Sequence, residues 1–196
     1  MFLACARRPT QRNSMRLFVA LRPPPDVRDA LTALAGGIEG ARWQSDNQLH
    51  LTLAFIGETE PHQAEAAAEA LSALIAPPVE LALGQFGSFD AGRPDRTSAL
   101  WIGVDPAGPV SHLAVAIRSA LRRAGVPPET RRFVPHITLA RFSRAGAPRD
   151  ALRPFLSTQV PPPLHWRAEN FHLVESRMGH GGSHYQPLAS YALTGA

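Results

Sequence analysis

Two short segments of the chain carry the same order of residue types. Residues 50–54 read HLTLA and residues 136–140 read HITLA. The chain has eight histidines in all, so two copies of this extended pattern are far more than chance supplies. Side chains alternate between the two faces of a β-strand, so each histidine shares a face with its threonine. The pattern predicts one polar, open face and one apolar, packed face on each strand.

The polar residues of these segments are suited to an in-line displacement at phosphorus. One neutral imidazole, of His50 or His136, would take a proton from attacking water, and the other, as imidazolium, would protonate the leaving oxygen. An imidazole with a pKa near ~6.5 serves either role at neutral pH. The hydroxyls of Thr52 and Thr138 would donate hydrogen bonds to the non-bridging oxygens, where charge accumulates. A cyclic phosphodiester brings a strained leaving group, so we predict neither metal nor cofactor.

The elements around the two segments follow the same order in both halves of the chain. We expect strand, helix, strand, helix, strand in each, with further strands near 165–175 and 185–193. The remaining ranges are a strand at 16–21, a helix from Asp26, strands at 49–57 and 79–86, an alanine-rich helix between those two, strands at 99–104 and 135–142, and helices at 110–124 and about 149–157. This repeat predicts an α+β fold of two similar lobes, each a sheet covered by helices on one face.

Strict alternation has two consequences for residues beside the histidines. On the first strand it places Phe55 on the packed face with Leu51 and Leu53. On the second it places Arg141 in phase with Leu139, away from the histidine. Either that strand bulges or ends and Arg141 meets phosphate, or Arg141 is structural.

Several other residues have a functional and a structural interpretation. Arg131 and Arg132 would meet an RNA backbone or lie in a solvated loop. Phe18 would stack on a base or pack in the core, and the core is favoured. Asp90, Arg93 and Asp95 fall in a turn that they are expected to solvate.

A zinc site is a further candidate near the end of the chain. Four histidines lie there: His165, His172, His180 and His184. We expect His180 and His184 to lie in a glycine-rich loop between the last two strands. No cysteine supports them, and metal sites need fixed ligands, so zinc is disfavoured.

Composition narrows the class of protein. Apolar residues make up 44% of 196 residues, which suffices for a core, and no apolar run approaches the ~18 residues that span a bilayer. All 20 basic residues are arginine, and without lysine a lysine-adenylate ligase mechanism is excluded. Residues 1–14 show no periodic pattern and are predicted to be a tail or a mis-called start, with the domain at 15–196. Cys5 is the only cysteine, which suits a cytoplasmic protein.

Over about residues 15–194 the chain resembles the two-histidine (2H) phosphoesterase superfamily. The resemblance rests on RLFVALRPP, RWQSDNQLHLTLAFIGE, ALWIGV, FVPHITLARF and FHLVESRMGHGGSHYQPLASYAL. The flanking segments favour the branch of RNA 2',3'-cyclic phosphodiesterases, historically called bacterial 2'-5' RNA ligases.

The resemblance implies a V-shaped bilobal fold with the two motifs in a central cleft. It also implies hydrolysis of a 2',3'-cyclic phosphate at an RNA or oligonucleotide end to a 2'-phosphomonoester, with His50 as proton donor and His136 as proton acceptor. Arg141 matches an arginine common in the family. We expect a monomer, with reverse 2'-5' joining at high substrate concentration. The alternatives are a 2H enzyme acting on 2'-5' oligonucleotides or small cyclic nucleotides, and a non-catalytic RNA-binding module.

Overall fold

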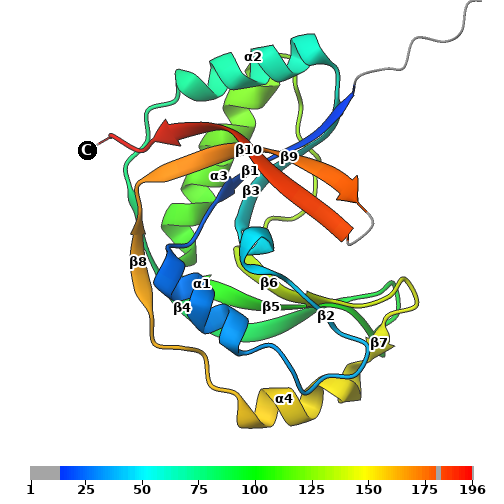
Figure 1. Cartoon of the computed structure of the whole chain (residues 1–196). Helices are drawn as coiled ribbons and strands as arrows, with labels where there is room; N and C mark the ends of the chain where they lie inside the picture. Colours follow the sequence, from blue (N-terminus) through cyan, green and yellow to red (C-terminus); the bar gives the residue numbers. More distant parts are fainter. Residues whose placement is uncertain (1–13, 180–181, 196) are drawn as a thin grey trace, which may run out of the picture.

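The fold is built on one curled antiparallel sheet (Figure 1). The computed structural model describes residues 14–179 and 182–195. Within these residues the strand order is β10-β9-β1-β3-β6-β5-β4-β8, while β2 pairs with β6 and β7 pairs with β5. The strands are β1 Met15–Leu21, β2 Arg42–Trp43, β3 Leu51–Thr59, β4 Val79–Asp90, β5 Arg96–Asp105, β6 His136–Arg141, β7 Ala147–Pro148, β8 His165–Ala168, β9 Asn170–Gly179 and β10 Gly182–Ala192. The predicted α+β class is confirmed, and the two strands that follow the histidines lie side by side at the centre.

Each of the two predicted lobes takes strands from both halves of the chain. One lobe runs outward from the centre as β3-β1-β9-β10, and the other as β6-β5-β4-β8. The strand that ends the first half, β4, pairs with β5 of the second half, and β9 pairs in turn with β1. Each lobe is therefore completed by strands from the other half of the chain, so neither half of the sequence builds a lobe alone.

The strand predicted near 165–175 is therefore two strands. β8 pairs with β4 in one lobe, and after Glu169 the chain continues into β9, which pairs with β1 in the other. Alternation of residue types cannot show this break, because both pieces are extended.

Helices cover the apolar face of the sheet. They are α1 Pro25–Ala33, α2 Pro61–Ser72, α3 Ala107–Arg123 and α4 Arg153–Thr158, with 3-10 turns η1 Asp46–Gln48 and η2 Arg149–Leu152. The longest, α3, buries Val110, Leu113, Ile117 and Leu121, which recur at helical spacing on one side. It contacts α2 and β3, which places the main core behind the central strands. None of the described helices is long and apolar enough to cross a membrane.

Both HxT strands contain a β-bulge at the leucine of the motif. In the β1–β3 pair, Ala20 lies opposite Thr52 and the adjacent Val19 lies opposite Ala54. Leu53 has no partner on β1 and is the extra residue. In the β5–β6 pair, Trp101 lies opposite Thr138 and the adjacent Leu100 lies opposite Ala140, so Leu139 is the extra residue. A bulge reverses the facing of the side chains that follow it.

The bulges change the predicted faces of two residues. Phe55 was expected on the packed face, and this is wrong: its side chain is 38% exposed and its ring lies 6.1 Å from that of Phe18, between centroids. Arg141 holds the equivalent position after the second bulge. It is exposed and borders the same cavity as His50 and Phe55, so of the two alternatives left open for Arg141 the bulge is the one observed.

Candidate active site

The two imidazoles are held by the same backbone contact. His50 Nδ1 lies 2.7 Å from the carbonyl oxygen of Gln48, and His136 Nδ1 lies 2.7 Å from that of Val134. A carbonyl oxygen only accepts, so Nδ1–H donates in both cases and Nε2 is the nitrogen left for a ligand. Each ring is thus fixed in orientation and tautomer by the residue two positions before it.

The two histidines lie on either side of the point where the lobes join. β3 and β6 pair antiparallel through Leu51 and Ile137, the middle residues of the two HxT triplets. Because the strands are antiparallel, the residues on either side of this pair also face each other: His50 lies opposite Thr138, and Thr52 lies opposite His136. Thr138 is buried, with 8% of its surface exposed, and Thr52 is half-buried. The structure therefore brings together the four polar residues that the sequence singled out.

Aromatic rings enclose each imidazole. The centroid of the His50 ring lies 4.9 Å from that of Phe18 and 5.0 Å from that of Tyr185. The centroid of the His136 ring lies 4.8 Å from that of Phe89 and 5.8 Å from that of Trp101. These rings shield the imidazoles from water only in part, because both histidines are half-buried.

The surroundings favour the neutral form of both histidines. Burial is the main cause, and it lowers the pKa of His50 to about 4, although the bond to Gln48 opposes the shift. The pKa of His136 is also lowered, again mainly by burial. The Arg141 charge lowers both pKa values further, and His136 adds to the effect on His50. One arginine thus acts electrostatically on both imidazoles.

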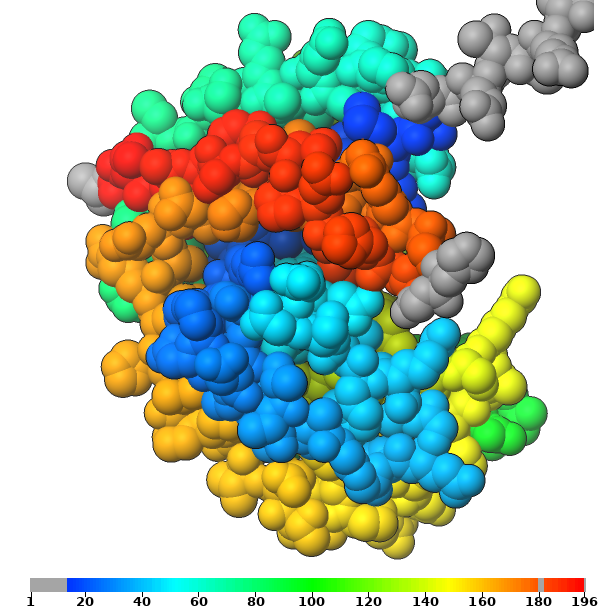
Figure 2. Space-filling view, in the orientation of Figure 1, coloured from blue at the N-terminus to red at the C-terminus, as the bar shows by residue number. Residues whose placement is uncertain are grey.

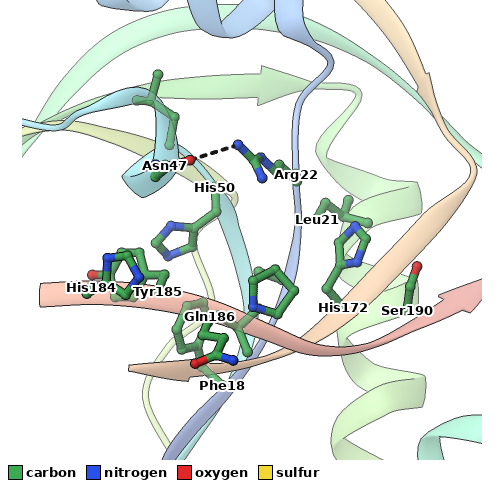
Figure 3. A pocket seen from close by; sticks show the side chains of 14 residues that line it. Phe18, Leu21, Arg22, Asn47, His50, His172, His184, Tyr185, Gln186 and Ser190 are labelled. Atoms are coloured by element: carbon green, nitrogen blue, oxygen red, sulfur yellow. Dashed lines mark hydrogen bonds between the residues drawn. The ribbon is translucent and has the colours of Figure 1, made fainter. Parts of the chain in front are cut away.

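Two cavities border His50. The larger has a volume of about 530 Å³ and extends over β9 and β10, as Figure 3 shows, with Arg22 and Asn47 near His50 and with His172, Gln186 and Ser190 on the neighbouring strands. The smaller, of about 300 Å³, contains Arg141. Figure 2 shows the surface hollowed between β10 and the segment leading into β3.

The residues weighed for other roles fall in different places. Phe18 is buried, with 3% of its surface exposed, so the favoured core interpretation is confirmed. It forms a small core cluster with Ala20 and Val174 and borders both cavities. Arg131 borders the smaller cavity and forms an ion pair with Glu129 at 2.9 Å.

The turn that joins β4 to β5 is held by ion pairs. Arg93 and Asp95 are paired at 3.3 Å, and Asp90 forms an ion pair with Arg149. Asp90, Arg93 and Asp95 are all exposed, as expected of side chains that solvate a turn.

The histidines of the zinc hypothesis are separated by the fold. His165 pairs into the other lobe on β8, whereas His172 and His184 border the larger cavity. His184 was expected in a loop, and this is wrong, because β10 begins at Gly182. His180 lies outside the described residues. Among the residues that are described, no cluster of three or more histidine, cysteine or acidic side chains could hold a metal.

Sequence reasoning singled out Phe18 but missed the other aromatic residues around the histidines, which are Tyr185, Phe89 and Trp101. Tyr185 comes from β10 and Phe89 from β4, each far along the chain from the histidine that it contacts. Only the strand order brings them there, so no local pattern could have found them.

Paired HxT histidines at the centre of a bilobal antiparallel sheet define the class of two-histidine phosphoesterases. The family model described as the 2'-5' RNA ligase superfamily matches residues 23–180, and the chain belongs to this family.

The sequence is similar to those of several named relatives. It is 32% identical over 185 residues to the RNA 2',3'-cyclic phosphodiesterase of Escherichia coli K12, covering 91% of this chain and 97% of the relative. It is also 32% identical over 196 residues to the protein of the same name from Thermus thermophilus, covering 92% and 91%.

Solved structures agree in fold. Escherichia coli LigT without ligand superposes with a TM-score of 0.74 at 29% identity, over 92% of this chain and 98% of LigT. TT0787 of Thermus thermophilus superposes with a TM-score of 0.76 at 29% identity, over 92% of this chain and 99% of TT0787.

Proposed function

We propose that the chain is an RNA 2',3'-cyclic phosphodiesterase that opens the cyclic phosphate to a 2'-phosphomonoester without a metal. The observation that carries the proposal is the pair of identically anchored imidazoles, each with Nε2 available, under the influence of one arginine. The names of the relatives from Escherichia coli and Thermus thermophilus support the substrate class.

The proposed reaction is one in-line displacement. His136 Nε2 accepts a proton from water as the water oxygen forms a bond to phosphorus. The bond between phosphorus and the ribose O3' breaks, and its electron pair goes to O3'. The His50 imidazolium gives its proton to O3', leaving the phosphate on O2'. We assign donor and acceptor in the order that the family resemblance implies.

Three side chains are proposed to stabilise the phosphoryl oxygens. Arg141 supplies a fixed positive charge beside both histidines. Thr52 and Thr138 supply hydroxyl donors next to the imidazoles, where charge grows in the transition state.

The lowered pKa of His50 sets a condition on its role as donor. The free protein keeps this imidazole neutral because burial and Arg141 disfavour the cation. A bound cyclic phosphate is an anion that offsets the Arg141 charge and raises the pKa of His50. In this proposal the substrate brings the site into its reactive protonation state.

The larger cavity suits the nucleoside that carries the phosphate. Its volume of about 530 Å³ falls in the range of ~300–1,000 Å³ typical of small-molecule sites. Tyr185, which is half-buried, offers an aromatic ring, and Asn47 and Gln186 offer amide groups for base edges. Monomeric state and cytoplasmic location stay predictions.

The test is hydrolysis of a nucleoside 2',3'-cyclic phosphate in EDTA by wild type, His50→Ala and His136→Ala. A positioned acid or base contributes ~10²–10⁴-fold, so each substitution should remove most of the rate. The matched control is His112→Ala, which removes an exposed histidine on α3. A 3'-phosphate product, or full activity in either cleft variant, would contradict the proposal. Turnover of only 2'-5' oligonucleotides would favour the alternative substrate.

A further inference from the structure

The smaller cavity beside His50 is rich in arginine. Its volume is about 300 Å³, and three arginines border it: Arg16 on β1, Arg131 in the segment before β6, and Arg141 at the end of β6. Two serine side chains, Ser176 and Ser183, border it as well. We refer to it as the arginine cavity.

The arginine cavity has an excess of positive charge. Arg131 is paired with Glu129 at 2.9 Å. Neither Arg16 nor Arg141 forms an ion pair with any residue in the ranges 14–179 and 182–195. By contrast, Arg22, which borders the larger cavity, contacts Asp46 at 3.1 Å. Glu129 also borders the cavity, so three positive charges face one negative charge, and the guanidinium groups of Arg16 and Arg141 are the two without an ion pair in the described residues.

The arginine cavity adjoins the reaction centre at His50. Phe18, His50 and Tyr185 border both it and the larger cavity, so these three residues form the boundary between the two. Arg141 belongs to the arginine cavity and also acts on both imidazoles. A phosphate held at His50 and Arg141 therefore has Arg16 and Arg131 as its next basic neighbours in the same cavity.

We propose that the arginine cavity binds a second phosphate of the RNA strand, the 5'-phosphate of the nucleotide that carries the cyclic phosphate. The inference rests on the proposed function and adds a preference for strands over free nucleosides. Arg16, which has no ion pair within the described residues, and Arg131, whose charge is shared with Glu129, bind this phosphate. Ser176 and Ser183 supply hydroxyl donors. Guanidinium groups suit this ligand because they bind phosphate oxygens in a bidentate manner.

The experiment compares two substrates that differ by one group. One is a nucleoside 2',3'-cyclic phosphate, and the other is the same molecule with a 5'-phosphate. The readout is the ratio of their kcat/KM values, which does not depend on the folded fraction because both substrates meet the same enzyme preparation. Wild type should favour the 5'-phosphorylated substrate by about tenfold or more, the size expected of a charge-assisted contact.

The variant that tests the cavity is Arg16→Gln with Arg131→Gln, which should bring the ratio close to one. The matched control, Arg153→Gln on α4, removes an exposed arginine from another part of the molecule and should keep the wild-type ratio. Raising the salt concentration should lower the wild-type ratio and leave that of the double variant nearly flat.

A wild-type ratio near one, or an unchanged ratio in the double variant, would overturn the inference while leaving the proposed function intact. If wild type hydrolysed neither substrate, both proposals would fall together.

Discussion

The two HxT strands present their histidines alike but surround them differently. Each imidazole donates from Nδ1 to the carbonyl two residues earlier, and each strand bulges at its motif leucine. After the bulge, however, one strand places Phe55 toward the cleft and the other places Arg141 there. The aromatic walls also differ, since Phe18 and Tyr185 flank His50 whereas Phe89 and Trp101 flank His136.

This difference separates two requirements of the proposed reaction. Proton transfer on opposite sides of phosphorus needs two similar imidazoles, and a pseudo-twofold fold supplies them. Binding one unsymmetrical substrate needs unlike surroundings, and these come from the positions that flank the motifs. His50 borders both the larger cavity and the arginine cavity, so the substrate is proposed to lie mainly on the β3 side.

The largest expected effect on this comparison comes from replacing the two residues that follow the bulges. Arg141→Gln should lower kcat/KM by about 10²-fold, since it removes the charge that stabilises the phosphoryl oxygens. Phe55→Leu, at the equivalent position, should lower it by less than about tenfold. Steady-state kinetics on a nucleoside 2',3'-cyclic phosphate would show both values. Equal losses in the two variants would mean that the strands are not specialised.

A smaller loss of activity is expected from a substitution that displaces Trp101, one of the two rings beside His136. A Cβ at Gly87 would lie 2.2 Å from the ring of Trp101, so Gly87→Ala must displace the ring that flanks His136. We expect roughly a tenfold loss of kcat, because the imidazole loses part of its support. The control is Gly103→Ala, whose Cβ would lie 3.6 Å from the same ring and 3.4 Å from the Gln85 carbonyl oxygen. If the two variants behaved alike, the wall would not matter for catalysis.

The pH profile should show the shared influence of Arg141. Reaction requires one protonated and one neutral imidazole, and both pKa values are lowered in the free protein. The maximum of kcat/KM is therefore expected below about pH 6.5, with a decline as the pH rises further. Arg141→Gln removes a cause of the lowering and should shift the profile to higher pH. A profile that kept its position in this variant would show that Arg141 does not act on the imidazoles.

The smallest expected effect is on stability. His50 has a pKa of about 4 when folded and an ordinary value of 6.5 when unfolded, so the unfolded chain binds more protons between these values. The free energy of unfolding should be highest above pH 6.5 and fall as the pH is lowered toward 4. Between pH 7 and pH 5 the titration of His50 should lower the free energy of unfolding by about 1–2 kcal/mol.

Denaturant titrations of His50→Gln at pH 7 and pH 5 would measure this share. The variant should lose less stability than wild type over this range, whereas His112→Gln, at an exposed position, should follow wild type. An equal loss in His50→Gln would show that the imidazole is not desolvated.

Residue periodicity was sufficient to predict the class of fold and most elements. The helix predicted at 110–124 is observed at Ala107–Arg123, and the strand predicted at 135–142 is observed at His136–Arg141. These predictions succeeded because apolar spacing along a helix or strand is a local property.

Features that depend on pairing between distant strands were not predictable. The exchange of β4 and β9 between lobes is fixed by contacts across the whole chain. A bulge beside Arg141 was one alternative that the sequence left open, but the bulges at Leu53 and Leu139 arise from the match to β1 and β5, which no local pattern fixes. They place Phe55 and Arg141 in the cleft. The histidines and threonines could be assigned to one site because their pattern is repeated, whereas Tyr185 and Phe89 carry no such signal.

The measurement that tests the central claim most directly uses a leaving group that needs no proton. A cyclic substrate with sulfur in place of the ribose O3' releases a thiolate, which leaves readily without an acid. If His50 is the donor and His136 the acceptor, His50→Ala should lose less than about tenfold on this substrate, whereas His136→Ala should keep its full loss of ~10²–10⁴. Rescue of His136→Ala in place of His50→Ala would reverse the two roles. Undiminished losses in both variants would contradict the two-histidine mechanism.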